Sequence, residues 1–292
     1  MKNKKQLLTD LVNTQNLKDL IGAYEEIAAM RMRKVKRSVL INRDFFSGLN
    51  DIYRRVMFTY RFSRHHKSSK DGHGWLPLAT NGKTVSVLIS SNTGLYGDVI
   101  KNTYNLFKKN ILGTTTDLVI IGKIGRQLLE FEMSKTDSKR PYTYFQMSDN
   151  GVDDDNIREV AEHLLSYENI VVYHGLYISI LSQKPTATFV TGKALEVPSE
   201  GSMNELKCII EPSVEEVTKF FERQIVASIF EQTVYEASLS KFASRMMSLD
   251  FASENIGASL HKISFARLKL KHTSESMSQI ERLSGLQIWT NK

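Results

Sequence analysis

The stretch LSKFASRMMSLDFASENIGASLHKI, residues Leu239–Ile263, decides the fold of this chain. Its apolar residues return at alternating steps of three and four, which is the seam pattern of a helical coiled coil. The seam comprises Leu239, Phe242, Met246, Leu249, Ile256, Leu260 and Ile263, with Ser253 in one position. We therefore expect a long helix that packs along one face against another helix.

The helix that contains this seam is expected to begin just after Pro212. Ser213 is followed by Glu215 and Glu216, and a serine cap with acids in the first turn is a typical helix start. No proline follows Pro212, and none precedes Pro77. Because proline breaks helix interiors, both ends of the chain can form uninterrupted helices.

Residues 1–62 show a second helical pattern. Its apolar positions are Leu7, Leu11, Leu17, Leu20, Tyr24, Ile27 and Ala28, followed by Phe45, Leu49, Ile52 and Val56. Neither terminal arm can bury an apolar stripe alone, so we expect the two arms to pair as an antiparallel coiled coil. A bundle of two or three broken helices is the alternative that periodicity leaves open.

The middle segment, residues 83–211, alternates strands and helices. The expected strands are 85–89, 117–121, 142–145, 169–173, 176–182 and 186–190, with helices at 98–109, 123–132 and 155–167. Such alternation predicts a mostly parallel sheet covered by helices. The predicted fold class is therefore α/β: a long antiparallel α-helical coiled coil, made by segments 1–62 and 212–292, plus a Rossmann-like α/β domain.

Composition excludes several other classes of protein. Cys208 is the single cysteine, so a disulfide within the chain and a thiolate zinc site are excluded. No run of about 18 apolar residues predicts a transmembrane helix. The N-terminus lacks the apolar core of a signal peptide, so we expect a cytoplasmic protein.

No motif predicts an active site. The turn TGLYGD, Thr93–Asp98, matches neither of the glycine-rich phosphate-binding patterns, G-x-G-x-x-G and G-x-x-x-x-G-K-[ST]. The acids Asp153, Asp154 and Asp155 lack the spacing of a calcium loop and are interpreted as a solvated helix start. His174 has no serine or acid partner at a recognisable spacing, so we expect it to be structural. We expect no catalytic residues and no metal site.

The net charge of +7 is concentrated in the first arm. Residues 1–80 hold 16 basic and 7 acidic side chains, and the basic stretch MRMRKVKRS occupies residues 30–38. Such a charge distribution is typical of a surface that binds nucleic acid or an acidic protein.

Three stretches of sequence together resemble one family. They are Gln15-Asn16 with Ala23, Glu25 and residues 27–34 in the first arm, residues 88–97, 117–122 and 182–186 in the middle, and Glu211-Pro212, residues 243–246 and Glu254-Asn255 in the second arm. In this order they resemble the gamma subunit, the central rotor shaft, of F-type rotary ATP synthases.

The resemblance implies a mechanism in which this chain turns inside a hexameric ring of alternating α and β catalytic subunits. ATP or ADP and Mg would bind to those partners, so no cofactor is expected in this chain. A small epsilon-like central-stalk subunit and a membrane rotor ring would meet the α/β domain, which we call the foot. The resemblance implies no nucleic-acid partner, and a location at the inner face of the cell membrane as part of a complex.

The resemblance also implies four contact regions. We name them the basic collar (Arg31, Arg33, Lys34, Lys36 and Arg37), the catch-loop contact (Lys271 and His272), the bearing tip (Leu283, Leu286, Ile288 and Trp289) and the foot turn (Gly94, Leu95 and Gly97). The collar would face acidic segments of the β subunits, and the tip would seat in the bearing of the ring.

The sequence departs from the family pattern at several positions. Asn92 and Thr93 replace an Asp-Arg pair, Lys241 stands where glutamate is common, and Lys271-His272 replace an Arg-Gln pair. These departures favour a divergent member, such as the shaft of an F-type-like ATPase that is not coupled to proton transport. Two hypotheses from other classes remain: a basic coiled-coil protein that binds nucleic acid, and a small nucleotide-dependent enzyme that uses the Gly94–Gly97 turn.

Overall fold

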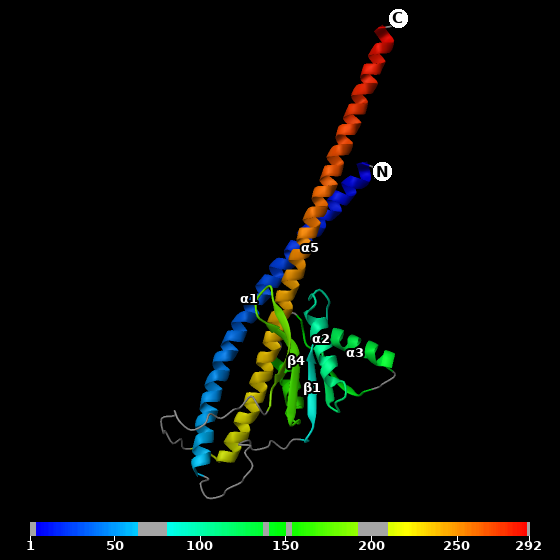
Figure 1. Ribbon diagram of the computed structural model, residues 1–292. Coiled ribbons are helices and arrows are strands. Elements are labelled where there is room, and N and C mark those ends of the chain that lie inside the picture. Colours follow the sequence, from blue (N-terminus) through cyan, green and yellow to red (C-terminus); the bar gives the residue numbers. More distant parts are fainter. Residues whose placement is uncertain (1–3, 64–80, 137–139, 150–153, 192–209, 291–292) are drawn as a thin grey trace. The chain divides into compact units, whose positions relative to one another are not determined.

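The computed structural model describes residues 4–63, 81–136, 140–149, 154–191 and 210–290 (Figure 1). The order of elements is α1 (Lys4–Ser63), β1 (Thr84–Ile89), α2 (Val99–Ile111), β2 (Asp117–Ile121), α3 (Lys123–Thr136), β3 (Tyr142–Phe145), α4 (Asp154–Leu164), β4 (Asn169–Tyr177), β5 (Gln183–Phe189) and α5 (Val214–Thr290). The two terminal helices contain 60 and 77 residues, which confirms the uninterrupted helices expected from the placement of proline.

The chain forms two compact units. Unit 1 consists of Met1–Ala28 and Met246–Lys292, and unit 2 consists of Ala29–Arg245. Unit 1 therefore holds the first part of α1 and the last part of α5, while unit 2 holds the other parts of both helices and the whole sheet. The boundaries predicted for three segments, 1–62, 83–211 and 212–292, stay predictions.

The sheet in unit 2 has the strand order β3-β2-β1-β4-β5. The first four strands are parallel, and β5 is antiparallel to β4. The chain passes from β1 to β2 to β3 in one direction across the sheet, and then crosses back past β1 to form β4. Because connections between parallel strands are right-handed, α4 lies on the face of the sheet opposite α2 and α3. The Rossmann-like plan is confirmed. The separate strand expected at 176–182 is wrong, because β4 extends to Tyr177 and a turn follows it.

Alternate residues of β1 enter two different cores, as the two-residue period of a strand requires. Val85, Val87 and Ile89 pack with α4, with α5 and with Phe46, Leu49 and Tyr53 of α1. Leu88 points to the other face and packs with α2 and α3. A third cluster joins the β1–α2 loop to both long helices; it contains Val35, Val39, Tyr96, Val99, Ile100, Leu239 and Phe242.

The two long helices run antiparallel in unit 2. Arg43 on α1 pairs with Glu236 on α5, and ten residues later on α1 the ring of Tyr53 lies 6.3 Å from that of Phe221. Residue numbers therefore rise along α1 as they fall along α5. The expected start of α5 is also confirmed, because the backbone N–H of Glu216 donates to the Ser213 hydroxyl at 3.2 Å.

The buried face of α1 is only in part the face that the sequence pattern indicated. Leu17, Leu20, Tyr24 and Ile27 are 41–53% exposed in unit 1, and Phe45 and Ile52 are each 52% exposed in unit 2. Four predicted positions, Leu7, Ala28, Leu49 and Val56, are buried and belong to a seven-residue repeat that also contains Ile21, Val35 and Asn42, while Val39 and Tyr53 are buried beside it. The repeat includes an asparagine and an alanine, so hydrophobicity alone did not identify it.

The seam predicted on α5 is confirmed. Leu239 and Phe242 are buried in unit 2, and Leu249 is buried in unit 1. The remaining apolar seam positions of unit 1 between Met246 and Ile263 are half-buried: Met246, Ile256, Leu260 and Ile263.

Candidate functional site

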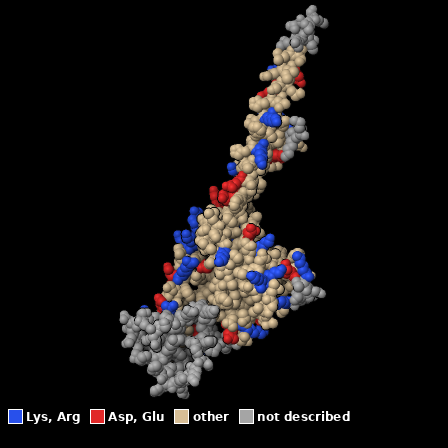
Figure 2. Space-filling view, viewed as in Figure 1, with Lys and Arg blue, Asp and Glu red and all other residues tan. Residues whose placement is uncertain are grey.

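The basic collar lies on α1 within unit 2. Val35 and Val39 turn inward from this stretch and pack against Phe242, so the intervening residues face outward. Arg33, Lys34, Lys36 and Arg37 are exposed, and Figure 2 shows basic side chains along this flank of α1. Arg31 is half-buried and lies close enough to Tyr96 to act on it electrostatically. The structure therefore offers four of the five predicted cations to a partner.

The exposed face around the collar also contains large apolar side chains. Met30, Leu40, Ile41 and Phe45 are 52–63% exposed. At 100° per residue, Met30, Ile41 and Phe45 lie on the same side of α1 as Lys34 and Arg37. Arginine mixed with aromatic side chains and methionine is typical of a protein interface, whereas phosphate binding uses cations and hydrogen-bond donors. This composition favours an acidic protein surface over nucleic acid as the partner.

The foot turn is exposed and is fixed by Tyr96, the buried residue between Leu95 and Gly97. Leu95 has the left-handed φ of 67°, and Gly97 follows with φ 55°. Tyr96, between them, is 3% exposed, lies edge-on to Phe242 and has the guanidinium of Arg245 4.5 Å from its ring centre. Burial raises the pKa of the Tyr96 hydroxyl. The turn thus presents Leu95 outward while Tyr96 fixes it to α5.

The backbone donors next to this turn already bind a carboxylate. The N–H groups of Asn92 and Thr93 donate to Oδ2 of Asp149 at 2.7 and 2.9 Å, and the Thr93 hydroxyl donates to the same oxygen at 3.2 Å. A phosphate at the end of β1 would need such donors. Because Asp149 occupies them, the geometry disfavours a nucleotide site at the Gly94–Gly97 turn.

Asp149 also binds α5 through a buried ion pair. Nζ of Lys241 lies 3.3 Å from Oδ1 of Asp149 and donates to the carbonyl oxygen of Ser90 at 3.2 Å. The side chains of Lys241 and Asp149 are only 10% and 8% exposed. Burial lowers the pKa of Lys241, and the carboxylate of Asp149 opposes that shift. We call Lys241, Asp149, Asn92 and Thr93 the polar anchor.

Sequence reasoning missed the polar anchor but noted three of its four members. Asn92, Thr93 and Lys241 are all positions at which the sequence departs from the family pattern, and the structure brings the three together around Asp149. The carboxylate that joins them was not singled out. Residues that depart together from a family pattern, although they are far apart in the chain, can be in contact with one another. The departures at Asn92, Thr93 and Lys241 were therefore the signal that could have indicated a shared partner.

His174 is a structural histidine within β4. It is 1% exposed, with Nε2 2.8 Å from the Thr188 hydroxyl and Nδ1 3.2 Å from the carbonyl oxygen of Gly175. Burial lowers its pKa, because the charged imidazolium would lose its hydration. Both ring nitrogens are engaged within the sheet, in keeping with the structural role expected from the sequence.

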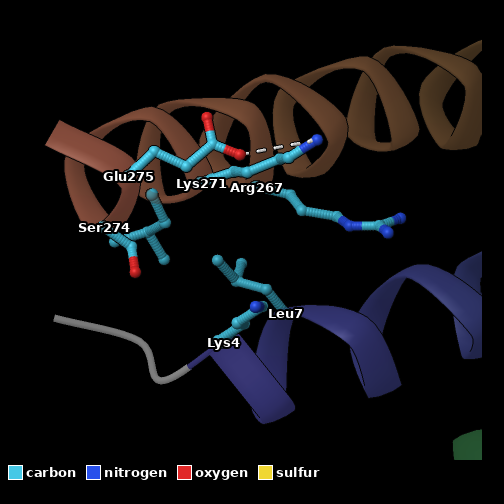
Figure 3. A pocket seen from close by; sticks show the side chains of 7 residues that line it. Lys4, Leu7, Arg267, Lys271, Ser274 and Glu275 are labelled. Atoms are coloured by element: carbon cyan, nitrogen blue, oxygen red, sulfur yellow. Dashed lines mark ion pairs between the residues drawn. The ribbon is translucent and has the colours of Figure 1, made fainter. Parts of the chain in front are cut away.

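The catch-loop contact lies in unit 1, where both of its residues are exposed. Nζ of Lys271 lies 3.8 Å from Glu275 and Nδ1 of His272 lies 4.0 Å from it. Lys271 also lines a pocket between the helices, with Lys4, Leu7, Arg267, Leu270, Ser274 and Glu275 (Figure 3). Of the bearing tip, Leu283 is 65% exposed. The side chains of Leu286, Ile288 and Trp289 lie outside the described residues.

The described part of the chain contains no group of three His, Cys, Asp or Glu side chains that could hold a metal ion. Cys208, Asp153 and the histidines His65, His66 and His73 lie outside the described residues. Within the same described part, no helix is both long and apolar enough to cross a membrane.

Comparisons with known proteins give one consistent answer. The family model described as ATP synthase matches residues 3–271. The ATP synthase gamma chain of Staphylococcus epidermidis is 23% identical over 266 residues, covering 87% of this chain and 88% of its own length. The gamma chains of Staphylococcus haemolyticus and Buchnera aphidicola are each 22% identical, covering 98% of both chains.

The fold has a counterpart among solved structures. The central stalk and c-ring structure of the Tetrahymena thermophila mitochondrial ATP synthase contains a chain that matches with a TM-score of 0.57 and 17% identity. The match covers 80% of this chain and 99% of that one. At this identity the likeness establishes the shared fold.

Proposed function

The chain belongs to the gamma-chain family of ATP synthases and is the central-stalk rotor subunit of an F-type enzyme, and we propose that it turns inside a hexameric ring of alternating α and β subunits. The observation that carries the proposal is the antiparallel pairing of α1 and α5 beside a Rossmann-like sheet, in a chain that the family model matches over residues 3–271. A paired helix of this kind is stiff, and an asymmetric shaft can present a different face to each catalytic site as it turns.

The basic collar is proposed to contact acidic segments of the β subunits. Arg33, Lys34, Lys36 and Arg37 are exposed on α1, and exposed apolar residues share their face. Charge complementarity steers association and tolerates sliding, while the apolar residues add contact area. The foot turn, whose Tyr96 lies close to Arg31, is proposed to contribute to the same contact.

ATP or ADP and Mg are proposed to bind on the partner subunits rather than on this chain. The occupation of the Asn92 and Thr93 amides by Asp149 supports this division of labour. Coupling would then be mechanical: each catalytic site is biased toward a different conformation by the face of the shaft that it meets.

The catch-loop contact and the bearing tip are proposed to engage the far end of the ring. Lys271, His272 and Leu283 are exposed in unit 1, as such a role requires. The foot is proposed to bind a small epsilon-like subunit and a membrane rotor ring, which would place the complex at the inner face of the cell membrane. In a specialised F-type-like ATPase the foot would drive another mechanical output instead.

The test is purification of the tagged full-length chain from its native cells under mild conditions. We expect two larger P-loop subunits in threefold molar excess and an ATPase activity that follows the complex. Recovery of a monomer without these partners would refute the proposal.

Reconstitution of the purified complex in vesicles then separates the two outputs. ATP-driven acidification of the vesicle lumen supports proton coupling, whereas hydrolysis without acidification supports the specialised ATPase. Retention of the chain on DNA or RNA at low salt, in place of the subunits, would favour the nucleic-acid hypothesis.

A further inference from the structure

We propose that the polar anchor is a torque-transmitting contact, in which Lys241 and Asp149 are positioning residues that prevent α5 from slipping against the foot sheet. This inference rests on the proposed rotor function. It concerns how force applied to the helix reaches the sheet within unit 2.

The ammonium group of Lys241 joins three segments that are distant in the sequence. It extends from α5, donates to the carbonyl oxygen of Ser90 just after β1, and pairs with Asp149 four residues after β3. In the sheet, β1 and β3 are separated by β2, so this group joins α5 to the loops that follow two strands that are not neighbours. A displacement of α5 along or around its axis must therefore move this group relative to two fixed acceptors.

Asp149 in turn fixes the loop that follows β1. Its Oδ2 accepts both the Asn92 and Thr93 N–H groups and the Thr93 hydroxyl, while Oδ1 faces Lys241. The Asn92 side chain extends the network, because its Nδ2 donates to the carbonyl oxygen of Met147 and its Oδ1 accepts the N–H of Lys123 at the start of α3. The anchor thus connects α5 to the ends of β1 and β3 and to α3.

The chemistry of the anchor suits a resistance to slip more than a contribution to stability. Much of the surface by which α5 meets the sheet is apolar, with Ile225, Val226, Ile229 and Phe230 in the core. Apolar contacts are non-directional, so a helix can shift across them at small cost. A buried ion pair stabilises little compared with an apolar pair of the same shape, but it is expensive to separate and depends on geometry.

The pair Arg43–Glu236 provides a comparison on the same helix in which the cation is exposed. The side chain of Arg43 is 54% exposed and that of Glu236 is 12% exposed, and the pair joins α1 to α5. An ion pair whose cation is open to solvent is screened by water and contributes less than a fully buried pair. If any ion pair on α5 could transmit torque, removal of the Arg43–Glu236 pair would lower the torque as much as removal of the Lys241–Asp149 pair.

The experiment uses the assembled complex with its catalytic ring immobilised. The natural cysteine is removed with Cys208→Ser, and a probe is attached at Lys109→Cys, an exposed position on α2 of the foot. ATP drives rotation, and the torque that the foot delivers against a viscous or magnetic load is measured. Lys241→Met is compared with Arg43→Met and with the unaltered anchor.

We expect Lys241→Met to lower the torque at the foot at least twofold, or to produce slippage under load, while the rate of ATP hydrolysis without load stays within twofold. Arg43→Met should deliver the full torque. Asp149→Asn retains the shape of the side chain and one acceptor for the loop amides, so it provides a gentler variant that assembles even if Lys241→Met does not. Its torque should also fall.

Full torque from the foot of an assembled Lys241→Met or Asp149→Asn complex would overturn the proposal. An equal loss in Arg43→Met would overturn it as well, because the effect would then not be specific to the buried pair. Absence of rotation in the complex with the intact anchor would instead refute the proposed rotor function, so the two failures are distinguishable.

Discussion

The hydroxyl oxygen of Ser240 on α5 lies 2.6 Å from the point at which a Cβ on Gly175 of β4 would stand. Cγ2 of Val99 lies 2.7 Å from the same point, so a side chain at Gly175 would meet α2 as well. The glycine at position 175 therefore leaves the space that the Ser240 side chain of α5 occupies against β4. Lys241, the next residue of α5, pairs with Asp149.

Gly175→Ala is expected to destabilise unit 2, because an added methyl group must push Ser240 or Val99 away. Overpacking of this kind typically costs about 1–3 kcal/mol. Gly94→Ala is the control, since no atom lies within 4 Å of its Cβ position. Chemical denaturation of the full-length chain should show a lower midpoint for Gly175→Ala and an unchanged midpoint for Gly94→Ala. Equal midpoints for both variants would show that α5 does not press on β4.

The ion pair between Lys241 and Asp149 predicts strongly non-additive effects on the free energy of unfolding. Lys241→Met leaves a buried carboxylate without its cation, which costs about 3 kcal/mol, and Asp149→Asn leaves a buried cation. The double variant has neither charge, so its loss should be smaller than the sum of the two single losses by about 1 kcal/mol or more.

Arg43→Met, which removes an exposed cation, should cost less than Lys241→Met. Denaturant titrations of the natural chain and the four variants measure all of these values. Additive losses at Lys241 and Asp149 would mean that the two groups do not interact in solution.

The long helices and the parallel sheet could be predicted because their signals are local. The absence of proline from both ends of the chain defined α1 and α5, and the apolar runs at 85–89 and 117–121 became β1 and β2. The buried face of α1 could be predicted only in part. Apolar residues occur on two of its faces, and which face is buried depends on the partner helix and on tolerated members such as Asn42 and Ala28.

The polar anchor could not be predicted from local sequence patterns, for a different reason. Lys241 and Asp149 are 92 residues apart, and a lysine within an apolar helical stretch is usually solvated. Only the sheet topology shows that the end of β1, the end of β3 and α5 meet at one place. The collar residues, by contrast, lie within seven positions of one helix, and four of the five are exposed beside the buried Val35 and Val39.

His174 predicts a loss of stability at mildly acid pH. Burial lowers its pKa below the ordinary value of 6.5, so the folded chain keeps the ring neutral while the unfolded chain takes up a proton near pH 6.5. The unfolded state then binds more protons, and the free energy of unfolding falls as the pH falls through about 6.5 toward the lowered pKa of the folded state. Glu236 on α5 faces the ring and partly opposes the shift.

The measurement compares the free energy of unfolding at pH 7.5 and pH 5.5. His174→Gln, which does not titrate, should lose less stability over this interval than the natural chain. His272→Gln removes an exposed histidine of unit 1 and should keep the full pH dependence. The same pH dependence in all three proteins would exclude His174 as its source.

The basic collar predicts an association rate that depends on salt. Replacement of Arg33, Lys34, Lys36 and Arg37 by glutamine removes four exposed charges from one flank of α1. Steering by complementary charge should be lost, so the rate of binding to the isolated catalytic ring should fall about 10-fold or more at low salt. The difference should shrink at high salt, because screening removes the same interaction from the natural chain.

The matched control removes four exposed lysines from elements other than α1: Lys101 and Lys109 of α2, Lys123 of α3 and Lys184 of β5. It changes the net charge by the same amount as the collar variant, so a general effect of charge would slow both proteins equally. Stopped-flow mixing with the ring at two salt concentrations separates the cases. If the ring binds the collar, the association rate of the collar variant is lower than that of the control at low salt and close to it at high salt. Equal association rates at both salt concentrations would place the acidic contact elsewhere on the shaft.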